Sequence, residues 1–229
     1  MDSSTVYSIV RTHYGDLATR PSKLEVSHEK IAKVFGYEPS ELHSIPQDAN
    51  LGVGCGNPPA LTKLRKGETV VDLGSGGALD VILAARKVGI QGRAIGVDMT
   101  RSMVDLAQRN AEEAAIPLPD STANCVISNS VVNLVPTAEK SCVFHEMFRL
   151  LVSGGRVAIS DLLAKKDLPR GLASDMALYL GCIAGASRVY EYEEYLRDAG
   201  FKDILIVDTD KDLKVYKDLA ESQSGDSVG

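Results

Sequence analysis

The chain has 229 residues, of which 44% are hydrophobic and 24% are charged, and this length and composition suit one α/β domain with additions. The net charge is −6, and the longest basic block is Lys165-Lys166. The sequence therefore has no basic cluster that would bind a polyanion, and we expect no nucleic-acid partner. The first residues have neither a basic start nor an apolar core, and no run approaches the roughly 20 apolar residues of a membrane span. We therefore expect a cytoplasmic protein with no membrane contact.

Residues 1–66 are predicted to form a helical cap. Helical periodicity runs from Val6 to Leu17 and from His28 to Phe35, and Ser40 to His43 suits a short capped turn. The sequence Asn57-Pro58-Pro59 then starts a helix, since proline is favoured at the first helical positions. We expect this helix to end near Gly67.

Strand and helix patterns alternate regularly in the next region, residues 67–220. Strands are predicted at Thr69 to Leu73, Arg93 to Val97, Ala123 to Asn129 and Arg156 to Ser160, with helices at Ala78 to Val88, Thr100 to Ala115, Glu139 to Leu151 and Tyr190 to Ala199. This alternation predicts an α/β fold with a Rossmann-like, mostly parallel sheet covered by helices on both faces. An apolar insertion near residues 170–187, a closing hairpin at Leu205 to Val207 with Leu213 to Tyr216, and a disordered tail at residues 221–229 complete the prediction.

One connection in this alternation is unusually short. A sheet of this kind normally has another strand between the helix ending near Ala115 and the strand at Ala123, but only Ile116 to Asp120 is available, and it contains two prolines. Either the sheet lacks an edge strand or a segment is missing from the chain.

A glycine turn between two acids is the main sequence motif. The stretch from Val70 to Gly77 reads as a strand and a turn, and it is followed by a helix and by a second strand that ends at Asp98. Glycines at Gly74 and Gly76, with Ser75 between them, let backbone N–H groups approach a ligand closely, and an acid at position 98 can accept both ribose hydroxyls. The pattern predicts a nucleotide-cofactor site.

The same residues favour S-adenosylmethionine over a dinucleotide. A dinucleotide site has a third glycine where this chain has Leu79, and Asp72 would repel a diphosphate. Asp72 would instead suit a cofactor with a cationic amino-acid end.

Four scattered cysteines are too few for a disulfide framework, and we expect reduced thiols. Cys55 lies in a glycine-flanked loop before the first strand, while Ser130 and Cys182 follow later elements of the α/β alternation. Because ligands gather beyond the carboxyl ends of parallel strands, these three positions are predicted to converge. Cys125 and Cys142 are expected to be buried small apolar residues.

Across most of its length the sequence resembles the arsenite S-adenosylmethionine methyltransferases, a family with the class I methyltransferase fold. The matching segments are Tyr14-Gly15, Phe35-Gly36-Tyr37, Ile45-Pro46, Ala49 to Pro58, Val71 to Gly77, Gly96 to Thr100, Val126 to Asn129, Asn133-Leu134, Gly154 to Arg156, Ser160-Asp161, Gly181 to Ala186 and Ala199 to Phe201. The glycine-turn motif is shared by many methyltransferases, whereas the cysteine loops are more specific.

The resemblance implies methyl transfer from S-adenosylmethionine to trivalent arsenic held by cysteine thiolates, with the arsenic lone pair as nucleophile. It implies catalytic roles at Cys55, Ser130 and Cys182, with arsenic bound by the two cysteines, and a thiol reductant such as glutathione or thioredoxin as co-substrate. The cofactor-binding residues that it implies, together with the glycine-turn motif, are Asp72, Gly74, Ser75, Gly76, Asp98, Met99, Ser128 and Asn129.

Two residues depart from the family pattern. Ser130 stands at the position of a third arsenic-binding cysteine, and a serine hydroxyl is a hard, weak ligand for arsenic. Ala78 stands at a family glycine and is expected to change little. Two rival interpretations therefore stay open: a weakly active or inactive binder of arsenic or S-adenosylmethionine, and a methyltransferase for another small acceptor.

Overall fold

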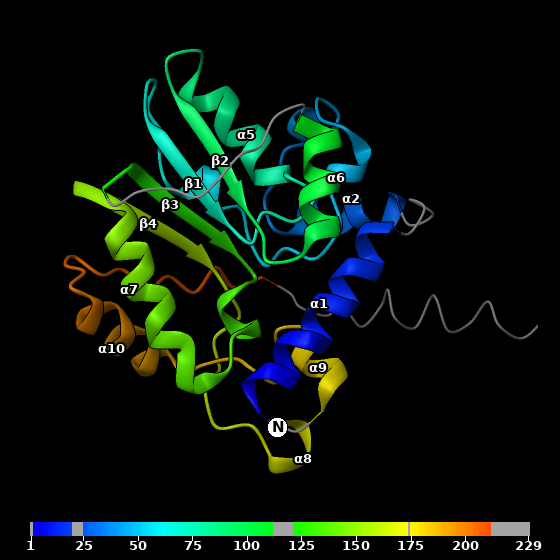
Figure 1. Cartoon of the computed structure of the whole chain (residues 1–229), viewed down its shortest axis with the longest axis vertical. Helices are drawn as coiled ribbons and strands as arrows, with labels where there is room; N and C mark the ends of the chain where they lie inside the picture. The colour runs from blue at the N-terminus through cyan, green and yellow to red at the C-terminus, as the bar shows by residue number, and fades with distance from the viewer. Residues whose placement is uncertain (1, 20–24, 112–120, 174, 212–229) are drawn as a thin grey trace, which may run out of the picture.

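A parallel sheet forms the centre of the protein in the computed structural model, which describes residues 2–19, 25–111, 121–173 and 175–211 (Figure 1). Its strands are β1 (Thr69–Leu73), β2 (Arg93–Val97), β3 (Ala123–Asn129) and β4 (Leu151–Ser160). They lie in the order β2-β1-β3-β4, and each neighbouring pair is parallel. The predicted α/β fold is confirmed, and the first three strands have their predicted bounds. The short connection at residues 116–120 lies outside the described residues.

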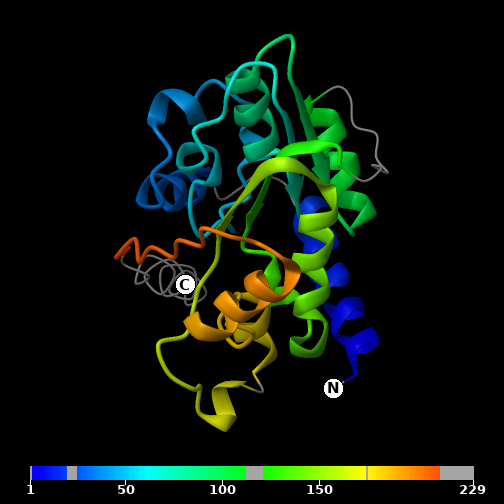
Figure 2. The same cartoon turned by 90° about the vertical axis from the view of Figure 1, so that its left-hand side faces the viewer.

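Both faces of the sheet are apolar because the side chains of β1 and β3 alternate between them. Val70 and Ile127 pack with Ala84 of α5 (Leu79–Val88) on one face. Val71 and Val126 pack on the other face with α7 (Lys140–Leu150) and α10 (Val189–Ala199). Figure 2 shows α10 beside α7, where Tyr192 and Phe144 meet edge to face with ring centroids 5.0 Å apart.

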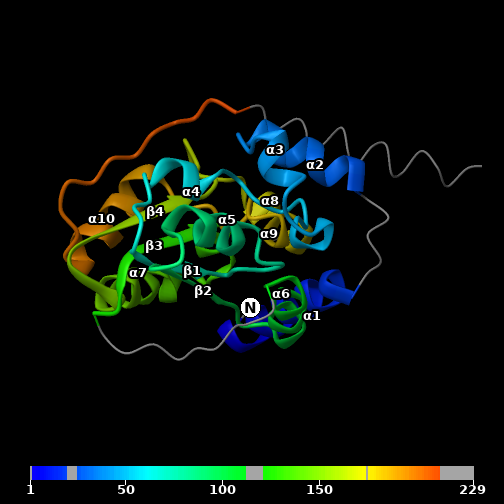
Figure 3. The ribbon, with the colours of Figure 1, turned by 90° about the horizontal axis from the view of Figure 1, so that it is seen from above.

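The other helices lie before, between and after these elements. They are α1 (Ser3–Thr19), α2 (Glu25–Val34), α3 (Pro39–Leu42), α4 (Pro58–Leu61), α6 (Arg101–Ala111), α8 (Arg170–Ala173) and α9 (Met176–Leu180), with short 3-10 turns η1 (Gln47–Ala49), η2 (Val132–Leu134) and η3 (Thr137–Glu139). Helix α1 lies beside α6 (Figure 3). The division of the chain at residues 66 and 67 stays a prediction.

Three of the predicted elements need correction. Helix α4 ends at Leu61 instead of near Gly67, because Lys63 takes a left-handed backbone conformation that a helix cannot continue through. Strand β4 begins at Leu151 instead of Arg156, so the glycines at 154 and 155 lie inside the strand, where its register with β3 is irregular.

The third correction concerns the closing hairpin. Residues 204–210 form no strand in the structure. Ile204 and Ile206 pack against the core while Leu205 is 83% exposed, so the alternation exists without a hydrogen-bonded ladder. The other half of the hairpin, at residues 213–216, and the tail at residues 221–229 lie outside the described residues.

Candidate active site

The glycine turn after β1 closes tightly against its neighbours. The N–H groups of Gly74 and Ser75 both donate to the carbonyl oxygen of Val97, at 2.7 and 3.0 Å. Gly74 has a φ of +75°, and a Cβ there would lie 2.2 Å from Cγ2 of Val131. Glycine is therefore required at this position by both conformation and space.

Asp98 organises the same turn from the end of β2. Its Oδ2 accepts a hydrogen bond from the Gly76 N–H at 3.0 Å, and its Oδ1 accepts one from the Thr100 N–H at 2.9 Å. Burial raises the pKa of Asp98. The neighbouring Met99 is 44% exposed, which leaves its side chain available to a ligand.

A second carboxyl group, that of Asp72, lies near both Asp98 and Asp80. Asp72 on β1 and Asp80 on α5 are both buried. Burial, followed by repulsion from Asp80 and Asp98, raises the pKa of Asp72 well above its usual range. A ligand that carries positive charge would relieve this repulsion, which is the chemistry of a sulfonium or an ammonium group.

The residues at the end of β3 serve different purposes. Ser128 is fully buried and its hydroxyl donates to the carbonyl oxygen of Leu73 at 3.2 Å, inside the sheet. The side chain of Asn129 reaches into the loop before β1, where its Oδ1 accepts the N–H of Cys55 at 2.8 Å. Asn129 thereby connects the sheet to the first cysteine.

Glycines on both sides of Cys55 allow its loop to lie directly on the strand ends. A Cβ at Gly54 would lie 3.0 Å from Nδ2 of Asn129, and one at Gly56 would lie 2.5 Å from Oγ of Ser160. The loop is thus seated over the carboxyl ends of β3 and β4. Side chains at either position would lift it.

Cys182 reaches the same place from the segment after α9. Its thiol donates to the carbonyl oxygen of Ser130 at 3.1 Å, and both residues are buried. Burial, followed by the nearby Cys55, raises the pKa of the Cys182 thiol. The structure therefore brings together the three positions that were predicted to converge.

The segment around Cys182 is fixed from several sides. Nδ2 of Asn133 donates to the carbonyl oxygen of Cys182 at 3.2 Å, and the hydroxyl of Tyr14 on α1 donates to that of Leu180 at 3.2 Å. The buried ammonium of Lys140 donates to the carbonyl oxygen of Gly185. Lys140 was missed from the sequence because a lysine in the first turn of a helix normally lies on the surface.

The other two cysteines have different outcomes. Cys125 is fully buried in the sheet, as predicted, but Cys142 on α7 is exposed, so its prediction was wrong. Cys142 lies on the outer side of α7, whereas Phe144 and Met147 carry the buried face. None of the four cysteines forms a disulfide.

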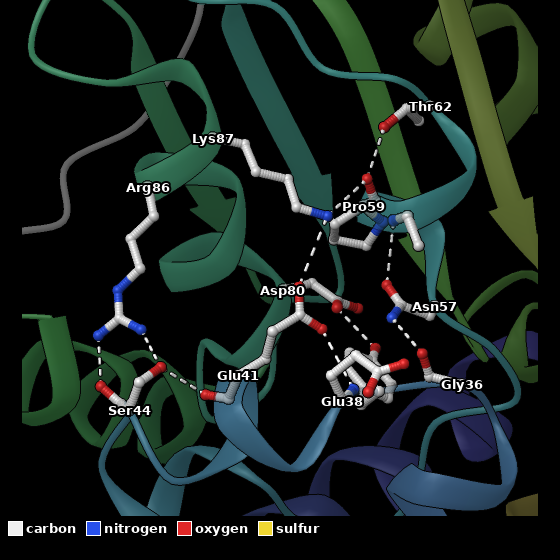
Figure 4. A network of polar contacts seen from close by, with 12 residues as sticks. Gly36, Glu38, Glu41, Ser44, Asn57, Pro59, Thr62, Asp80, Arg86 and Lys87 are labelled. Atoms are coloured by element: carbon white, nitrogen blue, oxygen red, sulfur yellow. Dashed lines mark hydrogen bonds and ion pairs between the residues drawn. The ribbon is translucent and has the colours of Figure 1, made fainter.

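The cap is attached to α5 by polar contacts (Figure 4). Arg86 donates to Ser44, and Lys87 pairs with Glu41 at 3.8 Å. Asp80, from the first turn of the same helix, accepts the hydroxyl of Tyr37 at 2.6 Å. Sequence reasoning missed Asp80 because an acid at a helix start is normally explained by the helix dipole.

Taken together, fold and site define an α/β protein with a ligand site at the carboxyl ends of a parallel sheet. Among the described residues, no group of three or more metal-ligating side chains could hold a metal ion. No helix in the described part of the chain has both the length and the apolar character needed to cross a membrane.

Comparison with known proteins identifies the class more narrowly. Residues 64–200 match the family model described as a methyltransferase domain, and the chain belongs to that family. Its membership supports S-adenosylmethionine as the cofactor.

Several of the relatives found are arsenite methyltransferases. The chain is 41% identical to the arsenite methyltransferase of Halobacterium salinarum over 80% of the chain and 50% of that protein. It is 26% identical to the human arsenite methyltransferase over 84% of the chain and 57% of that protein. Among solved structures, it is similar to the arsenic(III) S-adenosylmethionine methyltransferase of Chlamydomonas reinhardtii, with a TM-score of 0.60 and 28% identity over 83% of the chain and 69% of that structure. The predicted resemblance is confirmed, although the chain spans only about half the length of the Halobacterium and human proteins.

Proposed function

We propose that this protein methylates trivalent arsenic with S-adenosylmethionine as methyl donor. The observation that supports this most directly is the meeting of Cys55 and Cys182, which are far apart in sequence, beside the acid cluster at the carboxyl ends of the strands. Four cysteines that form no disulfide, one of them the exposed Cys142, agree with a reducing compartment, and we propose the cytoplasm.

The residues around the glycine turn suit the cofactor. S-adenosylmethionine supplies, when bound, an electrophilic methyl group on a positively charged sulfur. Asp72 places a carboxyl group beside the turn, where a bound cation would favour its ionised form, and Asp98 lies at the end of β2, where we propose that it binds ribose hydroxyls. We also assign to the cofactor site the turn at residues 74–76, whose N–H groups donate to Val97 and Asp98. We assign Asn129 and the exposed Met99 to the same site. We assign the buried Ser128 to the site through its backbone.

Cys55 and Cys182 suit arsenic because soft thiolates are its preferred protein ligands. Each neutral thiol would replace one hydroxyl of arsenous acid: an As–S bond forms, an As–O bond breaks, and the thiol proton leaves with the hydroxyl as water. The raised pKa of Cys182 is therefore compatible with binding, because the proton departs in the product water. The bound arsenic keeps its lone pair as the nucleophile, and positioning of this kind can contribute about 7–11 kcal/mol to catalysis.

Ser130 stands where a third protein sulfur would complete a pyramidal arsenic site. A serine hydroxyl is a poor arsenic ligand, so we propose that an external thiol supplies the third sulfur. Glutathione or a thioredoxin system would serve as this co-substrate and reductant. A Ser130→Cys variant should consequently bind arsenite more tightly and depend less on glutathione.

A turnover assay with S-adenosylmethionine, arsenite and glutathione tests the proposal, with products separated by chromatography and detected by arsenic mass spectrometry. We expect methylated arsenic from the wild type and from Ser130→Cys, and none from Cys182→Ser. If all three proteins bind the cofactor and none yields product, the arsenite assignment fails and another small acceptor is favoured. Arsenite binding without product, in the presence of bound cofactor, would indicate an inactive binding protein.

A further inference from the structure

Asp80 is a buried carboxylate that faces the cap and the end of β3 at the same time. It is 6% exposed. Its Oδ1 accepts the hydroxyl of Tyr37 at 2.6 Å, and its Oδ2 accepts Nδ2 of Asn129 at 3.0 Å. Both oxygens thus act as hydrogen-bond acceptors.

The amide of Asn129 is oriented by these partners. Its Nδ2 donates to Asp80 and to the carbonyl oxygen of Gly56 at 2.9 Å, and it also lies 3.2 Å from the hydroxyl oxygen of Tyr37. Its Oδ1 accepts the N–H of Cys55. A reversed amide would turn its oxygen toward the carboxylate and the carbonyl, and its NH₂ toward the Cys55 N–H, so every contact would become repulsive.

The cap supports the same loop from its other side. Nδ2 of Asn57 donates to the carbonyl oxygen of Gly36 at 3.0 Å, next to Tyr37 in sequence (Figure 4). The turn at residues 36 and 37 therefore contacts the Cys55 loop directly through Asn57 and indirectly through Asp80. Asp80, on α5, is therefore linked to the cap through Tyr37 and to the cysteine loop through Asn129.

We propose that Asp80 is a positioning residue, which fixes the orientation of the Asn129 amide and through it the seat of Cys55 in the substrate site. Asp80 acts by keeping the carbonyl side of the Asn129 amide toward the Cys55 backbone. The inference rests on the proposed function for its substrate, while the geometry that it describes does not depend on arsenic.

Two substitutions at Asp80 grade the effect. Asp80→Asn keeps one acceptor oxygen and should give an intermediate result. Asp80→Ala removes both acceptors and leaves only the Gly56 carbonyl and the Cys55 N–H to orient the Asn129 amide. For Asp80→Ala we expect the KM for arsenite to rise about tenfold, as loss of a hydrogen bond to a charged group implies. The Kd for S-adenosylmethionine should stay within about threefold of the wild type.

A second measurement needs no turnover. The alkylation rate of Cys55 by iodoacetamide, resolved by peptide mass spectrometry, can be divided by that of the exposed Cys142 in the same molecule. A loop that has lost its seat should change this ratio at least about threefold in Asp80→Ala, and less in Asp80→Asn. Binding of phenylarsine oxide, which bridges two thiols, should weaken in the same order.

Tyr192→Phe is the matched control. The hydroxyl of Tyr192 donates to the Asp161 carboxyl group at 2.6 Å. The substitution therefore removes a similar tyrosine–aspartate hydrogen bond at a residue outside the Cys55 loop. It should lower stability and leave the Cys55 to Cys142 ratio and the arsenite KM unchanged.

Any of three results would overturn the proposal. The first is that Asp80→Ala keeps the alkylation ratio and the phenylarsine oxide binding of the wild type, and the second is that Tyr192→Phe changes them as much as Asp80→Ala does. The third is that Asp80→Ala binds the cofactor more weakly while both of these properties stay unchanged. If the wild type methylates no arsenic, the function proposed above fails. The alkylation ratio and the phenylarsine oxide binding still decide the role of Asp80 in that case.

Discussion

Replacing Gly56 by alanine should disturb the substrate site through a steric contact that the structure defines. The added Cβ would lie 2.5 Å from Oγ and 2.6 Å from Cβ of Ser160. Carbon atoms in contact are separated by about 3.5–4.0 Å, so the loop or the strand end must move by about 1 Å. Gly56 does not have a positive φ, and the effect is therefore one of space alone.

The expected cost has two parts. Overpacking of this kind destabilises a protein by about 1–3 kcal/mol, and a shift of about 1 Å in a reacting group can lower the rate about 100-fold. We therefore expect Gly56→Ala to lower kcat/KM for arsenite far more than its loss of stability would explain. Thermal unfolding and steady-state kinetics of the same preparation measure both quantities.

Gly67→Ala serves as a control for stability. Gly67 has a φ of +86°, and no atom lies within 4 Å of an added Cβ. The substitution should therefore lower the free energy of unfolding by about 1 kcal/mol through backbone strain, without displacing the cysteine loop. Adding Ser160→Gly to Gly56→Ala removes the clash and should restore most of the lost kcat/KM. Wild-type kinetics in Gly56→Ala, or no recovery in the double variant, would refute the reasoning.

Three further outcomes are expected. Ala78→Gly should raise the free energy of unfolding by about 1 kcal/mol in chemical denaturation, because Ala78 has a φ of +76°; an unchanged or lower stability would contradict this. Native alkylation at pH 8 should modify the exposed Cys142 before the buried Cys125, because burial raises the pKa of Cys125 to about 12; equal rates would contradict it. Burial raises the pKa of Asp161 to about 7, so the folded state binds more protons than the unfolded state between about pH 4 and pH 7, and stability should fall as pH rises through that window. Asp161→Asn should show a smaller fall, since the raised pKa values of Asp72 and Asp98 still contribute, and a pH profile identical to that of the wild type in denaturant titrations would exclude the assignment.

The sheet could be predicted closely because its strands carry a strong local pattern. Val70 and Val71 are both buried, one on each face, and a short apolar run with this property is typical of a parallel strand. The segment at residues 204–207 has a comparable apolar pattern but forms no strand. A sequence pattern records which side chains are buried, whereas a strand also needs a partner backbone, and this depends on the rest of the fold.

The convergence of Cys55, Ser130 and Cys182 could also be predicted, since it follows from where loops lie in a parallel α/β sheet. The roles of Asp80 and Lys140 could not. Each is a charged residue in the first turn of a helix, a place where solvent normally surrounds it, and only the tertiary structure shows that both are buried. The same reasoning explains the error at Cys142, where helix phase decides exposure.

The backbone at two residues of the proposed site, Ser130 after β3 and Cys182 after α9, shows why the site depends on its surroundings. Ser130 and Cys182 have φ values of +63° and +61°, a left-handed conformation that costs a residue with a side chain about 1–3 kcal/mol. The cost is offset by specific contacts: the Ser130 N–H donates to the carbonyl oxygen of Ser160 at 2.9 Å, and Asn133 holds the carbonyl of Cys182. Glycine would adopt these angles freely but offers no side chain to bind a substrate. Strain at these two positions, together with glycines on both sides of Cys55, is therefore what the fold requires to bring the two thiols together at the ends of the strands.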